Sequence, residues 1–400
     1  MGDRLELRVG APAHGGHCVA RDADGRVVFV RHALPGELVR ARVTEASGSF
    51  ARADAVEVLS PSPDRVAPPC PHAGPGRCGG CDWQHASGPA QRALKAAIVR
   101  EQFARLAGLD VAVDVEALPG GLLGWRTRVQ YAVGADGTVG LRRHRSHEIE
   151  PLASCPLGAP EVAAAPSARR GVTGLEAVQG DDGAVTLLGR SPGGPRPARG
   201  RRPPDRVEVL SGPARVRHVV ADREFEVDAA GFWQVHPQAA GTFAAALLDL
   251  VRVQPGESVL DLYAGAGLFT ALLADAVGVT GSVLGVELSR AAVADAAANL
   301  ADLPQARVVA GRVTPDTVTE ADVVVLDPPR SGAGRGVMAA IVARAWRAIG
   351  YVACDPAALA RDVRVAVDAG WRLAQLRAFD AFPMTQHVEC VALLLPGVDQ

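Results

Sequence analysis

Residues 255–395 alternate apolar strand-like runs with helical patterns, and few folds accommodate this rhythm. The strand-like runs cover residues 258–262, 282–286, 306–309, 322–326, 349–353, 371–376 and 388–395. Consecutive β-α-β units place their strands in parallel and cover the sheet with helices. The pattern therefore predicts an α/β domain with a doubly wound parallel sheet, to which we assign residues 231–400.

The preceding residues have a different pattern, in which short strand-like runs are separated by turn residues. Alternating apolar and polar positions over residues 1–60 predict a small β-barrel, and several prolines after residue 60 mark its boundary. Residues 61–230 are predicted to form a central domain of short strands. This domain includes an amphipathic helix over 89–108 and an insertion rich in Arg, Pro and Gly near 190–206.

The composition is that of a globular protein and limits the classes of function. Of the 400 residues, 48% are hydrophobic and 22% charged, which excludes a wholly disordered chain. A formal net charge of −2 excludes a uniformly basic nucleic-acid coat but allows a local basic face. No apolar run is long enough to span a membrane, and the N-terminus lacks the apolar core of a signal peptide. We therefore expect a cytoplasmic protein, which we also expect to be a monomer, with cysteines that serve as metal ligands, catalytic groups or buried thiols.

The first strand of the α/β domain runs into a glycine turn. The segment from Tyr263 to Gly267 contains Gly265 and Gly267, and glycine lets the backbone approach a ligand closely. Glu287 ends the next strand, where its carboxylate can accept hydrogen bonds from a ribose. The same features describe dinucleotide-binding proteins, and a tight turn that only packs helix on strand also fits them.

A second loop on the same edge favours a nucleoside cofactor. Asp327 follows the fourth strand and precedes two prolines and Arg330, so it lies on the carboxyl edge with the glycine turn. The prolines stiffen the loop and fix the carboxylate toward a ligand. This combination resembles a class I S-adenosyl-L-methionine (SAM)-dependent methyltransferase with a Rossmann-like sheet. Arg330 replaces the aromatic residue that usually follows Pro-Pro in enzymes that methylate amino groups of bases.

A thiol and a carboxylate are predicted to meet at this edge. Cys354 ends the fifth strand, and Glu389 lies at the start of the last, which commonly runs antiparallel in methyltransferase sheets. A packing thiol and a structural ion pair of Glu389 with His387 or an arginine are the alternatives. Thiolate attack at C6 of uracil makes C5 nucleophilic toward a methyl donor, and a base must then remove the C5 proton. The sequence supplies one thiol, one acid and one cofactor site for this chemistry.

Several motifs occur in the order found in one enzyme family. They are GFWQV at 231–235, the turn from Asp261 to Thr270, LDPPR at 326–330, YVACDP at 351–356 and HVEC at 387–390. The chain resembles the RNA 5-methyluridine (uracil-C5) methyltransferases of the RumA/TrmA type, and its first 60 residues resemble a TRAM domain, an OB-like RNA-binding barrel. The resemblance implies Cys354 as nucleophile and Glu389 as proton acceptor. The cofactor contacts that it implies are Gln234, Tyr263, Glu287 and Asp327, to which the turn adds Gly265 and Gly267.

A loop in the central domain carries three cysteines. Cys70, Cys78 and Cys81 lie among glycines and prolines, and Cys155 can supply a fourth thiolate. Four thiolates hold either zinc or a [4Fe–4S] cluster, and the spacing does not decide between them. The rRNA-directed branch of the resembled family uses four cysteines for [4Fe–4S], which favours a structural iron–sulfur cluster beside an RNA-binding surface. This part is therefore expected to be a small cysteine-cluster β-domain.

The leading hypothesis is methylation of a uridine in structured RNA, with 23S rRNA preferred over tRNA. Arginines near residues 40–52, 126–145 and 196–206 are candidates for phosphate contacts. Departures from the family pattern at His236, Leu268 and Arg312 motivate an alternative, an RNA-binding or assembly protein that has lost catalysis. A nicotinamide oxidoreductase with an iron–sulfur centre also explains the glycine turn, but it gives no role to the thiol and the acid.

Overall fold

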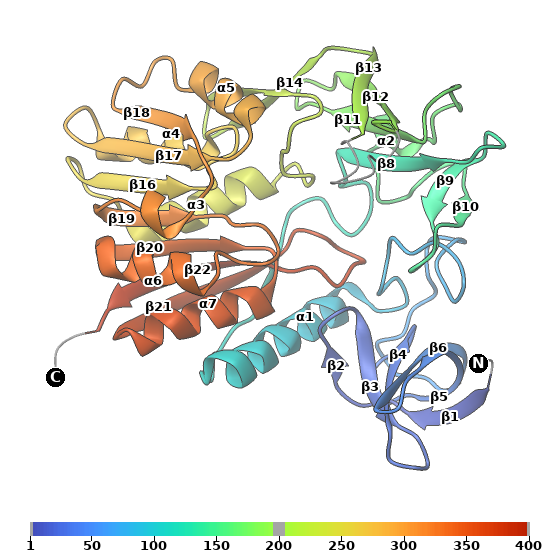
Figure 1. Ribbon diagram of the computed structural model, residues 1–400. Helices are drawn as coiled ribbons and strands as arrows, with labels where there is room; N and C mark the ends of the chain where they lie inside the picture. The colour runs from blue at the N-terminus through green and yellow to red at the C-terminus, as the bar shows by residue number, and fades with distance from the viewer. Residues whose placement is uncertain (1–2, 195–204, 398–400) are drawn as a thin grey trace.

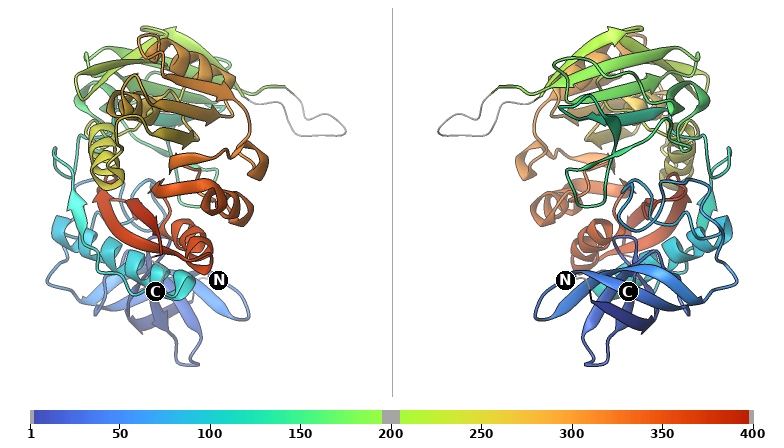
Figure 2. Two further views of the ribbon diagram at one scale, coloured as in Figure 1. Left: turned by 90° about the vertical axis from the view of Figure 1, so that its left-hand side faces the viewer. Right: turned by 90° about the vertical axis from the view of Figure 1, so that its right-hand side faces the viewer.

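The computed structural model describes residues 3–194 and 205–397, arranged as three sheets and a hairpin (Figure 1). Most of the insertion predicted near 190–206 lies outside the described residues. In both views of Figure 2, the N-terminal sheet lies at the bottom and the central sheet at the top, with the large sheet of the C-terminal half between them. The described residues therefore form regions that have sheets of their own.

The N-terminal region is a six-stranded sheet in the order β1-β5-β6-β4-β3-β2. Its strands are β1 (Arg4–Arg8), β2 (Pro12–Ala13), β3 (His17–Arg21), β4 (Val27–Arg31), β5 (Leu38–Ala46) and β6 (Phe50–Ser60). Alternate side chains such as Val28, Val30 and Val39 are buried between its curled faces, as a period of two requires. The sheet curls until β1 contacts β3. Within the described residues no ladder joins β1 to β2, so closure into an OB-like barrel stays a prediction.

The central region has a second six-stranded sheet, a short helix and a separate hairpin. The sheet has the order β10-β9-β8-β11-β12-β13. Its strands are β8 (Arg128–Val133), β9 (Val139–Arg142), β10 (Ile149–Pro151), β11 (Gly174–Gln179), β12 (Val185–Ser191) and β13 (Arg206–Ser211). Helix α2 (Pro160–Ala163) packs on it, and β14 (Arg215–Val220) pairs with β15 (Arg223–Asp228). Residues 70–81, the cysteine loop, contain turns and one bridge from Cys78 to Arg143.

The large sheet confirms the predicted doubly wound fold. Its order is β18-β17-β16-β19-β20-β22-β21-β7, and only β22 is antiparallel to its neighbours. The strands are β7 (Val115–Ala117), β16 (Ser258–Leu262), β17 (Ser282–Glu287), β18 (Ala306–Ala310), β19 (Ala321–Leu326), β20 (Ala345–Ala353), β21 (Trp371–Asp380) and β22 (Glu389–Pro396). All seven strand-like runs of the sequence correspond to strands here, and the carboxyl ends of the parallel strands share one edge.

Helices cover both faces of the large sheet. The helices are α1 (Gly88–Gln102), α3 (Ala239–Val251), α4 (Leu268–Val277), α5 (Arg290–Asn299), α6 (Arg335–Arg344) and α7 (Pro356–Asp368). One core layer contains residues of α1, α6 and α7, and the other contains residues of α3, α4 and α5. Among the described residues, no helix is both long and apolar enough to cross a membrane.

Helix α1 belongs spatially to the large sheet. It continues into a π-helical turn over Phe103–Ala107 and stops at Gly108, which confirms the predicted helix. Its apolar stripe, including Val99, packs toward α7 and β7, and β7 pairs in parallel with β21. The range 61–230 assigned to the central domain therefore contains two elements that pack on the C-terminal sheet. An amphipathic helix must bury its stripe, but the stripe does not identify its partner.

Candidate functional site

The glycine turn after β16 adopts a left-handed backbone at three positions. Tyr263, Gly265 and Gly267 have φ values of 66°, 55° and 88°. A Cβ atom on Gly267 would meet Ala296 at 3.3 Å, so this glycine lets α4 and α5 pack closely. A Cβ on Gly265 would meet nothing within 4 Å, which leaves open space against the backbone. The turn thus offers a cradle for a flat or extended ligand at the carboxyl edge of the sheet.

Glu287 lies beside this cradle with a fixed orientation. Its Oε2 accepts a hydrogen bond from the Gly265 N–H at 3.1 Å, and its Oε1 accepts from the Ser289 N–H at 2.6 Å. Each carboxylate oxygen has a further lone pair for a hydroxyl donor. The residues therefore fit a ribose diol bound at the end of β17.

Two further carboxyl groups approach each other at the ends of β16 and β19. Asp261 is fully buried; its Oδ2 accepts from Thr270 Oγ1 at 2.5 Å, and its Oδ1 has no partner within the described residues. Burial raises the pKa of Asp261 to about 7. Burial and the charge of Asp261 likewise raise the pKa of Asp327 to about 7. The part of the chain that the structure describes supplies neither group with an ion-pair partner, so the pair suits a cationic ligand such as a sulfonium.

Sequence reasoning did not assign a role to Asp261. The available signal was an acidic residue inside a mostly apolar strand, since burying such a group is costly without a partner.

Cys354 and Glu389 flank the last pair of the β20–β22 ladder at the carboxyl edge. The antiparallel ladder ends at the pair Ala353 and Cys390, and continuing its register by one residue places Cys354 opposite Glu389. Side chains of directly opposite residues lie on the same face, with Cβ atoms about 4.5–5.5 Å apart. Glu389 is 4% exposed, whereas Cys354 is only partly buried. The thiol is therefore more accessible from the edge than the acid is.

The charges around this pair are predominantly negative. Burial raises the pKa of Cys354 to about 12, and the neighbouring Glu389 and Asp327 carboxylates contribute to the rise. Burial and Asp327 also raise the pKa of Glu389 well above its usual value. Arg330 acts in the opposite direction on both groups. The structure thus brings together the predicted nucleophile, proton acceptor and Asp327, and it adds Arg330 as a counter-charge.

The loop that carries Arg330 is fixed by a residue that sequence reasoning missed. Asp362, on α7, accepts hydrogen bonds from Tyr351 Oη and from the backbone N–H of Ala333, both at 2.7 Å. A Cβ on Gly332 would come within 2.6 Å of this carboxylate, so the loop requires glycine there. The spacing of Asp362 from the motif gives no hint of this contact, because it depends on how α7 packs on the sheet.

Gln234 and His236 lie on the segment between β15 and α3. Gln234 lines a small cavity beside Arg128 and Trp233, and the described contacts do not join it to Tyr263 or Asp327, so its cofactor contact stays a prediction. His236 is buried; its Nδ1 accepts from the Gln238 N–H at 3.2 Å, and its ring stacks on a tryptophan. This departure from the family pattern therefore has a packing role.

The four predicted metal-ligand cysteines line one cavity of about 760 Å³. Burial and the charges of Cys155 and Cys78 raise the pKa of Cys81 to about 12, although its Sγ accepts a hydrogen bond from Gln84 Nε2 at 3.1 Å. Cys70 and Cys155 are buried. Within residues 3–194 and 205–397, no three His, Cys, Asp or Glu side chains are arranged to hold a single metal ion.

The candidate phosphate-binding arginines are mostly engaged in ion pairs. The pairs are Arg40 with Glu57, Arg52 and Arg145 with Glu45, and Arg143 with Glu148 and Glu150. Ion pairs at the surface contribute about 0–1 kcal/mol, so a phosphate can compete for such an arginine. Arg128 pairs with Glu176 at 3.3 Å and also donates to the backbone carbonyls of Ala229 and Gly231, so it anchors the segment before α3.

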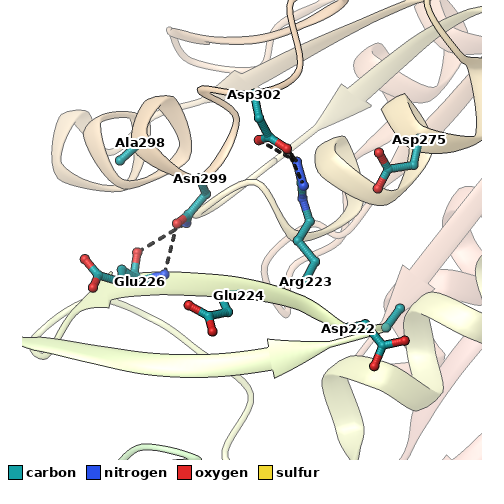
Figure 3. A pocket seen from close by; sticks show the side chains of 9 residues that line it. Asp222, Arg223, Glu224, Glu226, Asp275, Ala298, Asn299 and Asp302 are labelled. Carbon is teal, nitrogen blue, oxygen red and sulfur yellow. Dashed lines mark hydrogen bonds and ion pairs between the residues drawn. The ribbon is translucent and has the colours of Figure 1, made fainter.

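A second hollow, of about 580 Å³, lies between the β14–β15 hairpin and α5 (Figure 3). Arg223 reaches across it and binds both carboxylate oxygens of Asp302, at 2.7 and 2.9 Å. Asp222, Glu224 and Glu226 also line it, so the hollow is acidic and repels RNA phosphates. The pair of Arg223 with Asp302 holds the hairpin against the large sheet, on a face whose negative charge does not suit nucleic acid.

Comparisons with known proteins match separate parts of the chain to three families. The TRAM domain matches residues 1–56, tRNA (Uracil-5-)-methyltransferase matches residues 317–396, and protein-L-isoaspartate(D-aspartate) O-methyltransferase matches residues 234–314. The second match contains Asp327, Cys354 and Glu389. The third contains the glycine turn and Glu287.

Full-length relatives cover nearly the whole chain. An uncharacterized RNA methyltransferase of Streptomyces avermitilis is 47% identical, with 99% of each chain covered. A 23S rRNA (uracil(1939)-C(5))-methyltransferase of Halomonas elongata is 34% identical over 98% of this chain and 89% of its own. Among solved structures, the tRNA (uracil-54, C5)-methyltransferase of Pyrococcus abyssi in complex with S-adenosyl-L-homocysteine has a TM-score of 0.72 at 21% identity. That alignment covers 98% of this chain and 99% of the other, and it confirms the fold.

Proposed function

Because the chain belongs to the RNA (uracil-5-)-methyltransferase family, whose members use SAM, we propose that it methylates C5 of a uridine in 23S rRNA. The observation that carries this proposal is the position of Cys354 opposite Glu389 at the end of one ladder, beside Asp327. The choice of rRNA is supported by the relative from Halomonas elongata, whose similarity extends over nearly the whole chain. Methylation of a tRNA is the alternative outcome.

The cofactor site is proposed to lie between the glycine turn and Asp327. Glu287 accepts the ribose hydroxyls, the Gly265 backbone leaves room for the cofactor, and the carboxyl groups of Asp261 and Asp327 offset its positive charge. Tyr263 and Gly267 shape the turn, and Gln234 is proposed to reach the same cofactor from the segment before α3. SAM, when bound here, supplies an electrophilic methyl group to C5 of the uracil.

Cys354 is proposed to begin the reaction by adding, as a thiolate, to C6 of the ring. This addition converts the ring to an enolate and makes C5 nucleophilic. The raised pKa of the partly exposed Cys354 thiol means that its proton must pass to solvent before the attack. When the positive charge of SAM offsets the charge of Asp327, one of the negative charges that raise the pKa of Cys354 is removed. The positive charge of Arg330 also lowers this pKa and favours the thiolate.

Glu389 is proposed to complete the reaction. Once C5 carries the new methyl group, the Glu389 carboxylate removes the remaining C5 proton, the C6–S bond breaks with its electron pair on sulfur, and the methylated uracil ring and the Cys354 thiolate are released. The raised pKa of Glu389 makes the carboxylate a stronger proton acceptor than an exposed glutamate. Its burial keeps water from competing for the proton.

The cysteine loop is proposed to hold a [4Fe–4S] cluster through Cys70, Cys78, Cys81 and Cys155. The four side chains share one cavity, and backbone and side-chain N–H groups already donate to two of the sulfurs. The methylation transfers no electrons between the protein and the substrate, so the cluster has a structural role. It would order the surface beside β9 and β10 against which RNA lies.

The proposal is tested by mapping 5-methyluridine by mass spectrometry in rRNA and tRNA from cells with and without the gene. Loss of one modified site in 23S rRNA is expected. Purified protein should also form a covalent adduct with target RNA containing 5-fluorouridine, and Cys354→Ala should abolish both adduct and turnover. Cys390→Ala is the matched control, because this thiol is buried one residue from Glu389 and should leave adduct formation intact. An active Cys354→Ala enzyme would refute the nucleophile assignment.

A further inference from the structure

A loop of the N-terminal sheet reaches the carboxyl edge of the large sheet. It contains His14, Gly15 and Gly16 and joins β2 to β3. His14 Nε2 lies 3.1 Å from Asp355 Oδ2, and the Gly15 N–H donates to Gln386 Oε1 at 3.2 Å. Asp355 follows the proposed nucleophile in the chain, and Gln386 precedes the proposed proton acceptor by three residues. One loop therefore contacts both segments that carry the reacting groups.

Asp355 is held at both carboxylate oxygens. Its Oδ1 accepts from the Ala358 N–H at 2.8 Å and caps the N-terminus of α7, while its Oδ2 binds His14. Although burial opposes it, these hydrogen bonds leave the pKa of Asp355 below its usual value, so the group is a carboxylate. A carboxylate only accepts, so a hydrogen bond at this 3.1 Å contact requires a proton on His14 Nε2. The orientation of the turn that follows Cys354 depends on this second contact as well as on the helix cap.

The loop conformation is itself closely constrained. Gly15 and Gly16 have φ values of +106° and +80°, which glycine adopts readily. A Cβ on Gly16 would lie 2.7 Å from the Asp82 side chain. Asp82 Oδ2 accepts from the Gln386 N–H at 3.1 Å, and its Oδ1 accepts from Arg31 of the N-terminal sheet at 3.4 Å. Close packing and hydrogen bonds thus hold the loop against the segment that leads to Glu389.

We propose that His14 is a positioning residue of the methyltransferase site, which orients the Cys354 turn through Asp355. The N-terminal domain then completes the reaction site in addition to offering a surface to RNA. This inference rests on the function proposed above. The His14–Asp355 pair is partly exposed, at 37% and 21% of the side chains, so it contributes little to global stability. Its removal should therefore alter the placement of the thiol without unfolding the protein.

The test compares His14→Ala and His14→Gln with the wild-type enzyme. At saturating RNA and SAM, His14→Ala should slow both turnover and capture by 5-fluorouridine RNA on the order of tenfold, because small misplacements of a reacting group are costly. The KM for RNA, cofactor affinity and Tm should stay near wild-type values. His14→Gln retains an N–H donor and should restore a large part of the rate.

Arg21→Ala provides a control in the same domain, because this exposed arginine donates to Gly25 of its own turn. It should leave the rate at saturating RNA unchanged. A raised KM with an unchanged kcat in His14→Ala would show that His14 only binds RNA, and equal rates for His14→Ala and wild type would overturn the inference. If the wild-type enzyme forms neither adduct nor 5-methyluridine, the proposed function itself fails, which is a separate result.

Discussion

The carboxyl edge of the large sheet and the cysteine loop both gather reactive side chains, but they are built in different ways. At the carboxyl edge, Asp261, Asp327, Cys354 and Glu389 lie at the ends of four central strands that are mostly apolar and buried. In the cysteine loop, turns and one bridge position the thiols, with glycines between them. The first arrangement is formed by the hydrophobic core. The second has little packing of its own.

This difference indicates where each region obtains its stability. A buried sheet can hold carboxyl groups close together against their mutual repulsion, because unfolding the edge would expose the core. A glycine-rich loop cannot do this, and metal–thiolate bonds commonly supply the missing free energy. We therefore expect the carboxyl edge to stay formed without any ligand and the cysteine loop to depend on its cluster.

The largest expected effect is on the rate of the reaction at the carboxyl edge. Glu389→Gln should lower turnover by about 10²–10⁴-fold, because the C5 proton loses its acceptor. The thiol can still attack, so an adduct between protein and RNA should accumulate and be visible on denaturing gels. Glu116→Gln, at an exposed pair with Arg377, is the matched control and should turn over normally. Normal release of RNA by Glu389→Gln would remove the proton-acceptor role.

The next largest effect concerns the stability of the protein, which depends on a buried ion pair at the end of β21. Lys95, the only lysine of the chain, is fully buried; its Nζ donates to Asp380 Oδ1 at 2.5 Å and to the Phe382 carbonyl at 3.0 Å. Lys95→Met should destabilise the protein by about 3–5 kcal/mol, because it leaves Asp380 buried without its partner. Urea unfolding measures this change.

Removing both charges tests the cause of that destabilisation. Lys95→Met combined with Asp380→Asn should recover a substantial part of the lost stability, since no uncompensated charge then remains. A double variant as unstable as Lys95→Met alone would show that lost packing, and not the unpaired carboxylate, is responsible.

A smaller effect on catalysis is expected when a cysteine of the cysteine loop is replaced. Protein purified without oxygen should contain iron and sulfide, and Cys78→Ser should lose both and become sensitive to proteases near residues 70–81. Because the edge is held by the core, cofactor affinity should change by less than about twofold. Cys18→Ser, a buried thiol in the N-terminal sheet, is the control and should keep its iron. Zinc in place of iron would contradict the cluster assignment.

A last effect is a dependence of cofactor binding on pH. Asp261 and Asp327 have pKa values of about 7 in the free protein, so both are partly protonated at neutral pH. Their folded-state pKa values lie above the unfolded values, so the two groups make the free protein less stable as the pH rises from about 4 to 7. A cationic ligand prefers the carboxylates. Its affinity should therefore fall below pH 7, by up to about tenfold per pH unit for each group that must ionise.

Calorimetry between pH 5.5 and 8.5 measures this dependence. S-adenosyl-L-homocysteine lacks the sulfonium charge and should show a weaker pH dependence than SAM. Equal pH profiles for the two ligands would show that the carboxyl groups do not face the sulfonium.

Much of the fold and part of the site followed from periodicity and strand ends. The seven strand runs and the helix over 89–108 are confirmed, because apolar periodicity reflects burial that each element needs. The meeting of Asp327, Cys354 and Glu389 also followed, since parallel strands share a carboxyl edge. Asp362 and the pair of Lys95 with Asp380 could not be found in this way. Their contacts depend on side-chain packing between separate elements, which produces no periodic pattern in the sequence.

The sequence by itself determined which reactive groups stand at the carboxyl edge, because a thiol, an acid and a glycine turn lie at strand ends whose place in a doubly wound sheet is predictable. Only the tertiary structure decided which domain completes the site. His14 and Asp355 are more than 300 residues apart, and their contact exists because the N-terminal sheet docks beside α1 and the large sheet. Docking depends on the complementarity of whole surfaces, and no local pattern of residues encodes that property.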